Sequence, residues 1–539
     1  MKKKTLLMMA SEVQSKYSSP IVAVTIDDEV HDLQSSYTEA EKIDFIEQNS
    51  QIGWRIYRRS VLFLLIVAVN KLNRHAEVIA KFTVNNGLFC EIKIPGNFVN
   101  EDFINKIDTL MRQMITENIQ IIKHSVSKKE AISYFQKIGK YGKVNLISSM
   151  KYSYISLYTC EGYSDYLYGP MVHEARGLDL FALDYEPNGV LIRTPDEMTN
   201  GKIRDRIYQP KFASILSESK AWADILECRY IADLNYINKN NMIGDLIRVS
   251  EALQEKRIAQ IADHIFANHS NVRLILIAGP SSSGKTSFAQ RLNIQLRVNG
   301  LHPIMLSLDD YFLNRDNTPI NEKGEYDYEC LEALDIKLFN KNMTDLLDGK
   351  SVQLPRYNFI TGKREWNIED TLSIQSDQPI IIEGIHGLND KLTQDIPQKN
   401  KYKIYISALT QLNIDAHNRI PTTDIRFLRR LVRDYQFRGA KALKTIKQWP
   451  DIRAGEEHYI FPFQEAADIF FNSALIYEIG VLKKYAIPLL SEINRGEEGY
   501  TEARLILRFL QYVDEISSID QIPNNSILRE FIGNSVFFS

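Results

Sequence analysis

A glycine-rich segment near the middle of the 539-residue chain has the residue types of a phosphate-binding loop. It reads Gly279-Pro-Ser-Ser-Ser-Gly284-Lys285-Thr286 and matches the pattern GxxxxGK[ST]. In such loops backbone N–H groups surround phosphate oxygens, and the following helix directs its positive end toward them. Lys285 is expected to reach the β- and γ-phosphates, and the Thr286 hydroxyl to bind Mg²⁺. We expect the triphosphate to be bound by Gly279, Ser281, Ser282, Ser283, Gly284, Lys285, Thr286 and Ser287.

Two acidic residues follow short apolar runs further along the chain. Asp309 comes after the run 303–308, and Glu383 ends the run Ile380-Ile-Ile. A carboxylate at the C-terminal end of a strand beside a phosphate loop can accept the proton of an acceptor hydroxyl or help to bind Mg²⁺. We therefore expect Asp309 to act as a general base, although an aspartate that caps a turn has the same signature. Glu383 has the position of the acidic residue that ends a Walker B strand.

Several arginines share one face of a predicted helix. Arg426, Arg429, Arg430 and Arg433 are spaced i, i+3, i+4 and i+7, and Arg438 follows just beyond them. Cations on one helix face repel each other unless an anion lies nearby. The spacing therefore predicts a lid that closes over a triphosphate, and the alternative is a solvated helix face.

The elements that must position these residues alternate between strands and helices. Apolar runs at 273–278, 303–308, 379–382, 402–406 and 467–471 are typical of strands buried on both faces. With a helix expected over 287–298, this half is predicted to be an α/β domain with a mostly parallel sheet. The apolar spacing over 240–269 predicts one long helix that joins two halves. The strands expected before residue 240 follow one another rather than alternating with helices, which predicts an α+β region. Residues 500–531 are predicted to form a helical appendage.

Residues from about 272 to 485 resemble the uridine kinase/phosphoribulokinase family of P-loop kinases. The resemblance is carried by GPSSSGKT, Ser307–Phe312, Tyr326–Glu329 followed by Ala333–Asp335, Leu354–Tyr357, Ile382–Gly384 and the helix RFLRRLVRD. It implies that ATP and Mg²⁺ are the cofactors and that a nucleoside hydroxyl accepts the phosphoryl group.

The resemblance also implies a role for each matching residue. The implied catalytic residues are Asp309 as the base, Lys285, Arg429 and Arg433, and Arg426 is implied to contact the nucleotide. Thr286 and Glu383 are implied to bind Mg²⁺. The implied substrate contacts are Asp309, Asp327 at the ribose hydroxyls, Tyr357 at the base, and Arg364. The family has a base-contacting histidine where this sequence has Gly362, so pyrimidine specificity stays open.

Residues from about 21 to 200 resemble the N-terminal region of threonyl-tRNA synthetase, with Ile21–Asn49 similar to part of a TGS module. The segments 59–65, 129–135 and 168–172 are similar to its editing-type domain. That domain uses an HxxxH pair and a later Cys and His, whereas the matching positions here are Arg59, Phe63, Leu167 and Met171. None of these can replace that set, so we expect editing and metal chemistry to be lost. The region could then bind RNA, bind a regulatory ligand or pack against the kinase.

These features divide the chain into five predicted segments. They are a partial TGS-like module (1–52), an editing-like domain without its ligands (53–238), a linking helix (239–270), a P-loop kinase domain (271–495) and a helical tail (496–539). The expected fold class is multidomain, with an α+β N-terminal region, an α/β kinase with a mostly parallel sheet, and a C-terminal helical extension.

The composition is that of a globular protein without a dominant charge. The chain is 44% hydrophobic and 25% charged, and its formal net charge of −3 gives no global reason to expect nucleic-acid binding. Its four cysteines are scattered without a CxxC, which fits a reducing compartment. The apolar run at 5–10 is too short for a signal peptide, and the apolar run at 61–69 is too short to span a membrane. We therefore predict a cytoplasmic location and no membrane partner.

The leading hypothesis is ATP-dependent phosphorylation of the 5′-hydroxyl of a nucleoside, uridine or cytidine. A second hypothesis keeps the mechanism but uses another small hydroxyl acceptor, such as a sugar phosphate or a pantothenate-like alcohol, which Gly362 leaves open. A third is an RNA-associated regulator that uses ATP binding as a switch. The kinase resemblance implies a homo-oligomer, which the large N-terminal region could obstruct.

Overall fold

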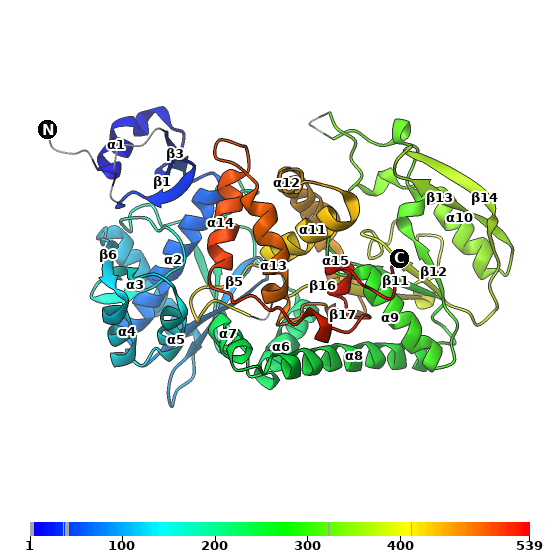
Figure 1. Cartoon of the computed structure of the whole chain (residues 1–539), viewed down its shortest axis with the longest axis horizontal. Helices are drawn as coiled ribbons and strands as arrows, with labels where there is room; N and C mark the ends of the chain where they lie inside the picture. The colour runs from blue at the N-terminus through cyan, green and yellow to red at the C-terminus, as the bar shows by residue number, and fades with distance from the viewer. Residues whose placement is uncertain (1–4, 36, 38–41, 322–323, 411, 539) are drawn as a thin grey trace.

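The C-terminal half of the computed structural model is built on a five-stranded parallel sheet (Figure 1). The structure describes residues 5–35, 37, 42–321, 324–410 and 412–538. The sheet order is β12-β15-β11-β16-β17, and every neighbouring pair is parallel. The strands are β11 (Leu274–Ala278), β12 (Ile304–Ser307), β15 (Ile380–Glu383), β16 (Lys401–Ser407) and β17 (Ile469–Asn472). The predicted mostly parallel α/β architecture is confirmed for this half.

Helices and a hairpin cover both faces of this sheet. Alternate side chains of β11 enter different cores, with Ile275 and Ile277 in one and Leu274 and Leu276 in the other. This explains why its sequence is apolar throughout, because a strand buried on both faces has no solvent side. The covering elements are α9 (Lys285–Val298), α10 (Ile336–Leu347), α11 (Thr422–Arg438), α12 (Ala442–Tyr459), α13 (Glu478–Ser491) and the hairpin of β13 (Val352–Asn358) and β14 (Lys363–Leu372).

The N-terminal half is α+β, with three antiparallel sheets. Their orders are β2-β1-β3, β4-β5-β10-β9 and β6-β7-β8. The strands are β1 (Ile21–Ile26), β2 (Glu29–Asp32), β3 (Ile43–Glu47), β4 (Glu77–Val84), β5 (Gly87–Lys93), β6 (Ile122–Ser127), β7 (Tyr154–Cys160), β8 (Tyr163–Asp165), β9 (Ala182–Glu186) and β10 (Gly189–Arg193). The helices are α1 (Leu6–Val13), α2 (Gln51–Leu72), α3 (Glu101–Thr116), α4 (Lys128–Lys137), α5 (Tyr141–Ser149), α6 (Pro210–Ile225) and α7 (Ile231–Lys239). Residues 1–4, 36 and 38–41 of the predicted 1–52 module lie outside the described residues.

A single long helix, α8 (Ile243–Ala267), starts beside α7 of the N-terminal half and runs along the C-terminal half to α9 (Figure 1). It matches the helix predicted over 240–269. Its buried side chains Ile258, Ile261 and Ile265 belong to the same apolar core as Phe135 of α4 and Ile277 of β11. The two halves are therefore joined by a continuous core rather than by a solvated linker.

A buried ionic cluster also joins the halves. The Lys143 Nζ lies 3.0 Å from Asp165 Oδ1 and 3.0 Å from Asp415 Oδ2, and it donates to the Tyr166 carbonyl. His417 Nδ1 lies 2.5 Å from the other Asp165 oxygen. Lys143 and Asp165 come from the N-terminal half, whereas Asp415 and His417 follow β16. All four side chains are at most 4% exposed, so the charges are balanced within the protein rather than by water.

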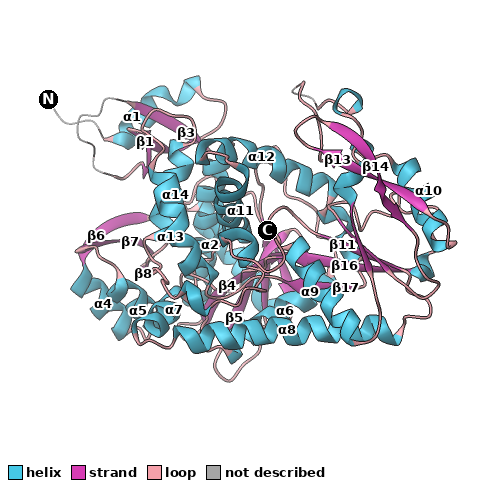
Figure 2. Ribbon diagram, turned by 45° about the vertical axis from the view of Figure 1, so that its right-hand side comes forward, coloured by secondary structure: helices cyan, strands magenta, loops and turns pink. Residues whose placement is uncertain are grey.

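The C-terminal tail is less helical than its sequence predicts. Helix α14 (Tyr500–Leu510) ends early, and the chain continues in turns to the single helical turn α15 (Arg529–Ile532). Pro523, Asn524 and Asn525 interrupt the apolar spacing here, and such residues favour turns over helix. The turn α15 packs against α11, and Glu530 in it contacts Ser287 of α9, so the tail returns to the centre of the molecule (Figure 2).

Candidate functional site

The phosphate loop, Glu383 and Asp309 meet at one edge of the parallel sheet. Ile277 of β11 pairs with Glu383, and Ser307 of β12 pairs with the same residue, so the three strands end at the same level. The loop begins directly after β11, and Asp309 follows β12 by two residues. Ligands of open α/β sheets bind at this carboxyl edge. The spacing in sequence is large, and parallel pairing is what brings these groups together.

The loop has the conformation that an anion cradle requires. Gly284 has φ +83° and Ser282 has φ +58°, and a Cβ on Gly279 would lie 2.0 Å from the Ile406 carbonyl oxygen. The hydroxyls of Ser282, Ser283 and Ser287 are buried, and none has a hydrogen-bond partner among the described residues. Buried polar atoms of this kind ordinarily find partners. These hydroxyls and the helix N-terminus therefore fit a group with many acceptor oxygens, such as a triphosphate.

Lys285 and Thr286 lie at the start of α9. The Lys285 ammonium donates to the carbonyl oxygens of Gly279 and Pro280, at 3.0 and 3.2 Å, and so folds back over its own loop. Thr286 Oγ1 donates to Glu383 Oε1 at 3.3 Å. The family resemblance implies that Thr286 and Glu383 bind Mg²⁺ together, and their side chains are in contact.

The environment of Glu383 favours its protonated form. Burial raises the pKa of its carboxyl to about 7, Lys285 opposes this rise, and the charges of Asp309 and Glu530 add to it. A hydroxyl oxygen beside a carboxylate is the type of ligand pair that Mg²⁺ uses together with phosphate oxygens. The described residues contain no group of three or more His, Cys, Asp or Glu side chains placed to hold a metal ion. These two residues therefore fit a Mg²⁺ ion that is bound chiefly through a substrate.

Asp309 is exposed to solvent at the end of β12. Surrounding protein atoms still displace part of its hydration shell, and this desolvation is the main cause that raises the pKa of its carboxyl. Lys285 opposes the rise, Asp310 adds to it, and Arg438 opposes it. An accessible carboxylate with a raised pKa, close to the P-loop lysine, is suited to accept a proton from an acceptor hydroxyl.

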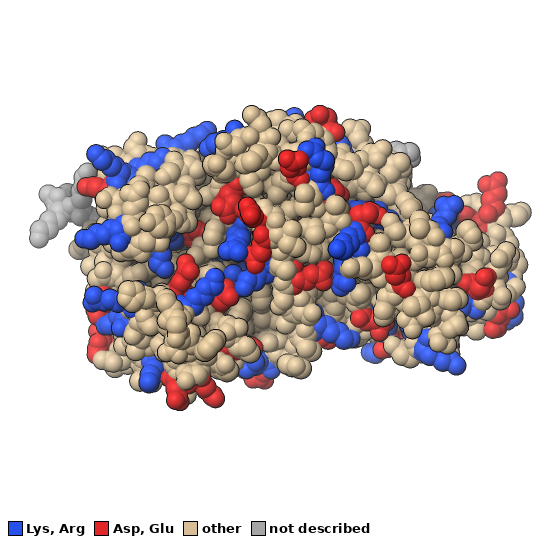
Figure 3. All heavy atoms as spheres, turned by 90° about the horizontal axis from the view of Figure 1, so that it is seen from below, with Lys and Arg blue, Asp and Glu red and all other residues tan. Residues whose placement is uncertain are grey.

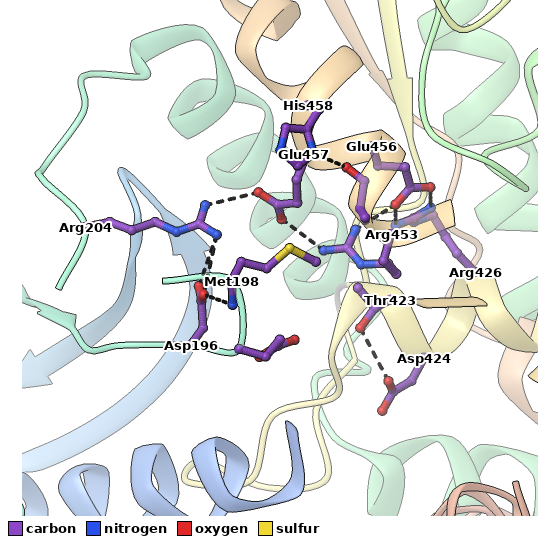
Figure 4. A network of polar contacts seen from close by, with 12 residues as sticks. Asp196, Met198, Arg204, Thr423, Asp424, Arg426, Arg453, Glu456, Glu457 and His458 are labelled. Atoms are coloured by element: carbon purple, nitrogen blue, oxygen red, sulfur yellow. Dashed lines mark hydrogen bonds and ion pairs between the residues drawn. The ribbon is translucent and has the colours of Figure 1, made fainter. Parts of the chain in front are cut away.

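Arg426 does not face open space over the loop, as the predicted lid would require. It forms a two-bond ion pair with Glu456 of α12, with Nη2 to Oε2 at 2.7 Å, and donates to the Ser281 carbonyl at 3.0 Å. Glu456 also accepts from the Ser281 amide at 3.0 Å and from Arg453. Figure 4 shows this cluster, in which Arg453 continues through Glu457 to the N-terminal half. Arg426 therefore supports the loop from behind.

Arg429 and Arg433 are also paired within the protein. Arg429 Nε donates to Glu478 Oε2 at 2.6 Å, and its side chain is fully buried. Arg433 pairs with its neighbour Asp434 at 2.8 Å. The predicted catalytic role of these two arginines would require their ion pairs to open. The helical spacing identified one arginine face correctly, but it could not show that acidic residues of α12 and α13 are buried against that face.

Two other arginines lie closer to the reacting edge. Arg430 Nη1 donates to the Ser281 hydroxyl at 2.8 Å. The charge of Arg438 acts on Asp309, where it lowers the pKa of the carboxyl against the effect of burial. Both were noted in the arginine pattern but not assigned to the site. Their proximity to the loop and to Asp309 makes them better candidates for contacts with a triphosphate than Arg429.

The predicted acceptor side is an aromatic cluster beside Asp309. The ring of Tyr357 lies 5.6 Å from that of Phe312 and 5.0 Å from that of Phe359. Burial raises the pKa of its hydroxyl to about 12, and the neighbouring Tyr328 hydroxyl adds to this rise. Asp327 Oδ1 accepts from the Glu329 and Cys330 amides, which fixes its turn.

Two arginines on the acceptor side, Arg364 and Arg315, have different surroundings. Arg364 is held by Asp335 at 2.9 Å. Gly362 has φ +69°, and a Cβ there would lie 2.7 Å from the guanidinium carbon of Arg315. The Arg315 side chain therefore fills the space that opens where position 362 has no side chain. Arg315 was not predicted, because its proximity to Gly362 comes from a contact across 47 residues of sequence.

Glu329 is a second residue that was not assigned from sequence. Burial raises the pKa of its carboxyl to about 7, and the charge of Glu456 adds to this rise, while Arg430 and Lys285 oppose it. A carboxyl near the P-loop lysine with such a pKa is a feature of functional sites. It occurred in the motif Tyr326–Glu329, but nothing in the sequence showed that Glu456 lies beside it.

The positions that match an editing site form a packed interior. Phe63, Leu167 and Met171 are each at most 2% exposed and belong to one apolar core. Arg59 Nη1 donates to the Pro170 carbonyl at 2.6 Å, beside them. The structure thus brings the four positions into one region, where they have apolar contacts and a partly buried guanidinium rather than metal ligands.

Comparison with known proteins identifies relatives of the C-terminal half. Residues 274–478 match the phosphoribulokinase/uridine kinase family. The uridine kinase of Macrococcus caseolyticus is 31% identical over 201 residues, which cover 37% of this chain and 87% of that protein. The uridine kinase of Lactobacillus johnsonii is 30% identical over 197 residues, which cover 36% of this chain and 84% of that protein. That of Staphylococcus haemolyticus is 30% identical over 201 residues, 37% of this chain and 87% of its own length.

Proposed function

Because the chain belongs to the phosphoribulokinase/uridine kinase family, we propose that it transfers the γ-phosphoryl group of ATP to the 5′-hydroxyl of a nucleoside, with uridine or cytidine preferred. The observation that supports this most directly is the common sheet edge shared by Lys285, Glu383 and Asp309. These side chains supply a phosphate contact, a metal ligand and a proton acceptor. Enzymes that transfer phosphoryl groups combine these three functions.

Asp309 accepts the proton of the acceptor hydroxyl as the hydroxyl oxygen bonds to the γ-phosphorus, while the bond from that phosphorus to the β–γ bridging oxygen breaks and ADP leaves. Its raised pKa makes it a better base than an ordinary carboxylate. Lys285 leaves the carbonyls of Gly279 and Pro280 to contact the phosphate oxygens. Thr286 and Glu383 would hold Mg²⁺, and the ion would supply positive charge that offsets the charge of the phosphates. The amides of the loop stay fixed, because Glu456 and Arg426 support Ser281 from behind.

The face of the molecule drawn in Figure 3 favours a small acceptor over a nucleic acid. In the view of Figure 3, Lys and Arg side chains alternate with Asp and Glu rather than forming a continuous basic area. Nucleic-acid binding depends on such an area. No helix in the described part of the chain is both long and apolar enough to cross a lipid bilayer.

One observation favours a second candidate, in which the acceptor carries an anionic group. Arg315 donates to the Phe359 carbonyl at 3.0 Å and lies 3.4 Å from the Tyr328 hydroxyl. Among the described residues no carboxylate lies within ion-pair distance of it. A guanidinium at the acceptor side without a carboxylate partner is suited to a phosphate group, as on a sugar phosphate.

The test is ADP release by the purified protein with Mg²⁺, ATP and a panel of nucleosides and sugar phosphates. We expect turnover with a pyrimidine nucleoside and a loss of about 10²–10⁴-fold in Asp309→Asn, the range for removal of a general base. Turnover with a sugar phosphate alone, abolished in Arg315→Met, would favour the second candidate. Acceptor-dependent turnover that is unchanged in Asp309→Asn would refute the assigned mechanism.

A further inference from the structure

The C-terminal segment 526–532 lies directly on the phosphate loop. The Glu530 Oε2 accepts a hydrogen bond from the Ser287 amide at 3.1 Å. Ile527 covers Gly284, where an added Cβ would lie 2.5 Å from the isoleucine Cγ2. The ring of Phe531 lies 5.0 Å from the guanidinium carbon of Arg429. Three side chains of one short segment thus contact the loop, the first turn of α9 and the arginine helix.

The Ser287 amide belongs to the group that a P-loop offers to phosphate. It is the third N–H of α9, and the first N–H groups of a helix have no partners within that helix. Those N–H groups and the helix dipole attract an anion, and in P-loops the anion is a phosphate of the nucleotide. Here the anion is a carboxylate of the same chain. A phosphate oxygen and Glu530 cannot both occupy this position.

The backbone of the segment is held firmly, but the Glu530 side chain is not. Ile527, Leu528 and Phe531 are fully buried, and Arg529 donates to the carbonyls of Ile519 and Ile522 at 2.8 and 2.7 Å. Glu530 is only partly buried. Among the described residues no cation lies within ion-pair distance of its carboxylate.

Glu456, the other carboxylate that accepts from a loop amide, differs in this respect. It is fully buried and paired with both Arg426 and Arg453. Removing it from the Ser281 amide would leave two buried cations without their partner, which is costly. Glu530 has no such constraint, so a change of its side-chain rotamer is enough to free the Ser287 amide.

We propose that the segment 526–532 forms one wall of the nucleotide site and that the Glu530 carboxylate competes with the nucleotide phosphates for the Ser287 amide, so that Glu530 sets the affinity for ATP. This inference rests on the proposed nucleotide site, but not on the identity of the acceptor. It also assigns a role to the tail, for which the sequence alone offered none.

The test is the dissociation constant of ATP, measured by calorimetry on the full chain without an acceptor. We expect Glu530→Gln to bind ATP about tenfold more tightly than the unmodified protein, because one charge-assisted hydrogen bond in the free protein is weakened. Adenosine, which has no phosphate, should bind equally to both proteins. The matched control is Glu502→Gln, an exposed glutamate in the first turn of α14, and it should leave ATP binding unchanged.

Two results would overturn the inference in different ways. Unchanged or weaker ATP binding in Glu530→Gln, with normal binding in the Glu502→Gln control, refutes the competition while leaving the nucleotide site intact. No ATP binding by any of the three proteins refutes the nucleotide site itself, and the inference with it. The melting temperature of each variant shows whether a loss of binding reflects a loss of folding.

Discussion

Replacing Lys143 by methionine removes the only cation that contacts both Asp165 and Asp415 in the described structure. Both carboxylates are 1% exposed, so water cannot replace the ammonium. Breaking a buried ion pair in this way typically costs about 3–5 kcal/mol. His417 still contacts Asp165, so Asp415 carries most of the cost. We take about 4 kcal/mol as the expected loss of unfolding free energy.

The shift in melting temperature depends on how much of the chain unfolds together. The entropy of unfolding is about 2.1 cal/mol/K per residue, or roughly 1.1 kcal/mol/K for all 539 residues. A loss of about 4 kcal/mol then lowers the melting temperature by roughly 4 °C. If only the segment 53–238 unfolded, its roughly 190 residues would give a fall of roughly 10 °C. The continuous core along α8 predicts the smaller shift and one transition.

The assay is differential scanning calorimetry of Lys143→Met beside Lys71→Met. Lys71 pairs with Glu161 at 2.7 Å, but those side chains are 39% and 37% exposed. An exposed pair contributes at most about 1 kcal/mol, so this control should shift the melting temperature by less than about 1 °C. Equal shifts in the two variants would refute the reasoning that the buried cluster stabilises the junction. Two separated transitions would refute the single cooperative unit.

Three further predictions concern the site. The pKa of Glu329 is raised from 4.5 to about 7, so the stability that its neutral form provides is complete below pH 4.5 and is lost as the pH rises through 7. The free energy of unfolding of Glu329→Gln, measured in urea, should therefore rise relative to that of the unmodified protein by up to ~3 kcal/mol between pH 5 and pH 8. A difference between the two proteins that stays constant with pH would contradict this. Thr286→Val and Glu383→Gln should each raise the Mg²⁺ concentration for half-maximal activity by about tenfold, the effect of losing one ligand contact, with the KM for the acceptor unchanged. Tyr357→Ala should raise the KM for the nucleoside by about tenfold or more while the KM for ATP stays constant. Tyr357→Phe should retain most of the affinity for the nucleoside, because the ring makes the contacts. A change in the KM for ATP alone would show that Tyr357 does not contact the nucleoside.

Local sequence patterns predicted the frame of the site because each of its parts is set by nearby residues. The strand 274–278 is apolar on both faces, and Gly284 supplies the positive φ from which α9 begins. Parallel pairing then places Glu383 and Asp309 at the same edge, since all carboxyl ends of a parallel sheet point one way.

The partners of the arginines could not be predicted in this way. The spacing of Arg426 and Arg429 shows that they share a helix face, but not which residues cover that face. Their partners, Glu456 and Glu478, come from α12 and α13 and are 30 and 49 residues further along the chain. Those glutamates have no pattern of their own, so the difference between a lid over phosphate and a buried support is decided only by tertiary packing.

The tail was misjudged for a related reason. Its apolar residues at 527, 528 and 531 have helical spacing, but Pro523 and the asparagines after it break the helix, and the side chains reach the core from turns. Its contact with the loop joins residues 243 positions apart in the chain. No local signal records such a contact.

The most direct test of the proposed reaction compares uridine with 5′-deoxyuridine as acceptors, in the presence of Mg²⁺ and ATP. The two compounds differ only in the hydroxyl whose proton Asp309 is proposed to accept. We predict release of ADP and formation of uridine 5′-monophosphate, identified by mass spectrometry, with uridine, and neither product above background with 5′-deoxyuridine. Equal ADP release with both compounds, or a phosphorylated product from 5′-deoxyuridine, would contradict phosphoryl transfer to the 5′-hydroxyl.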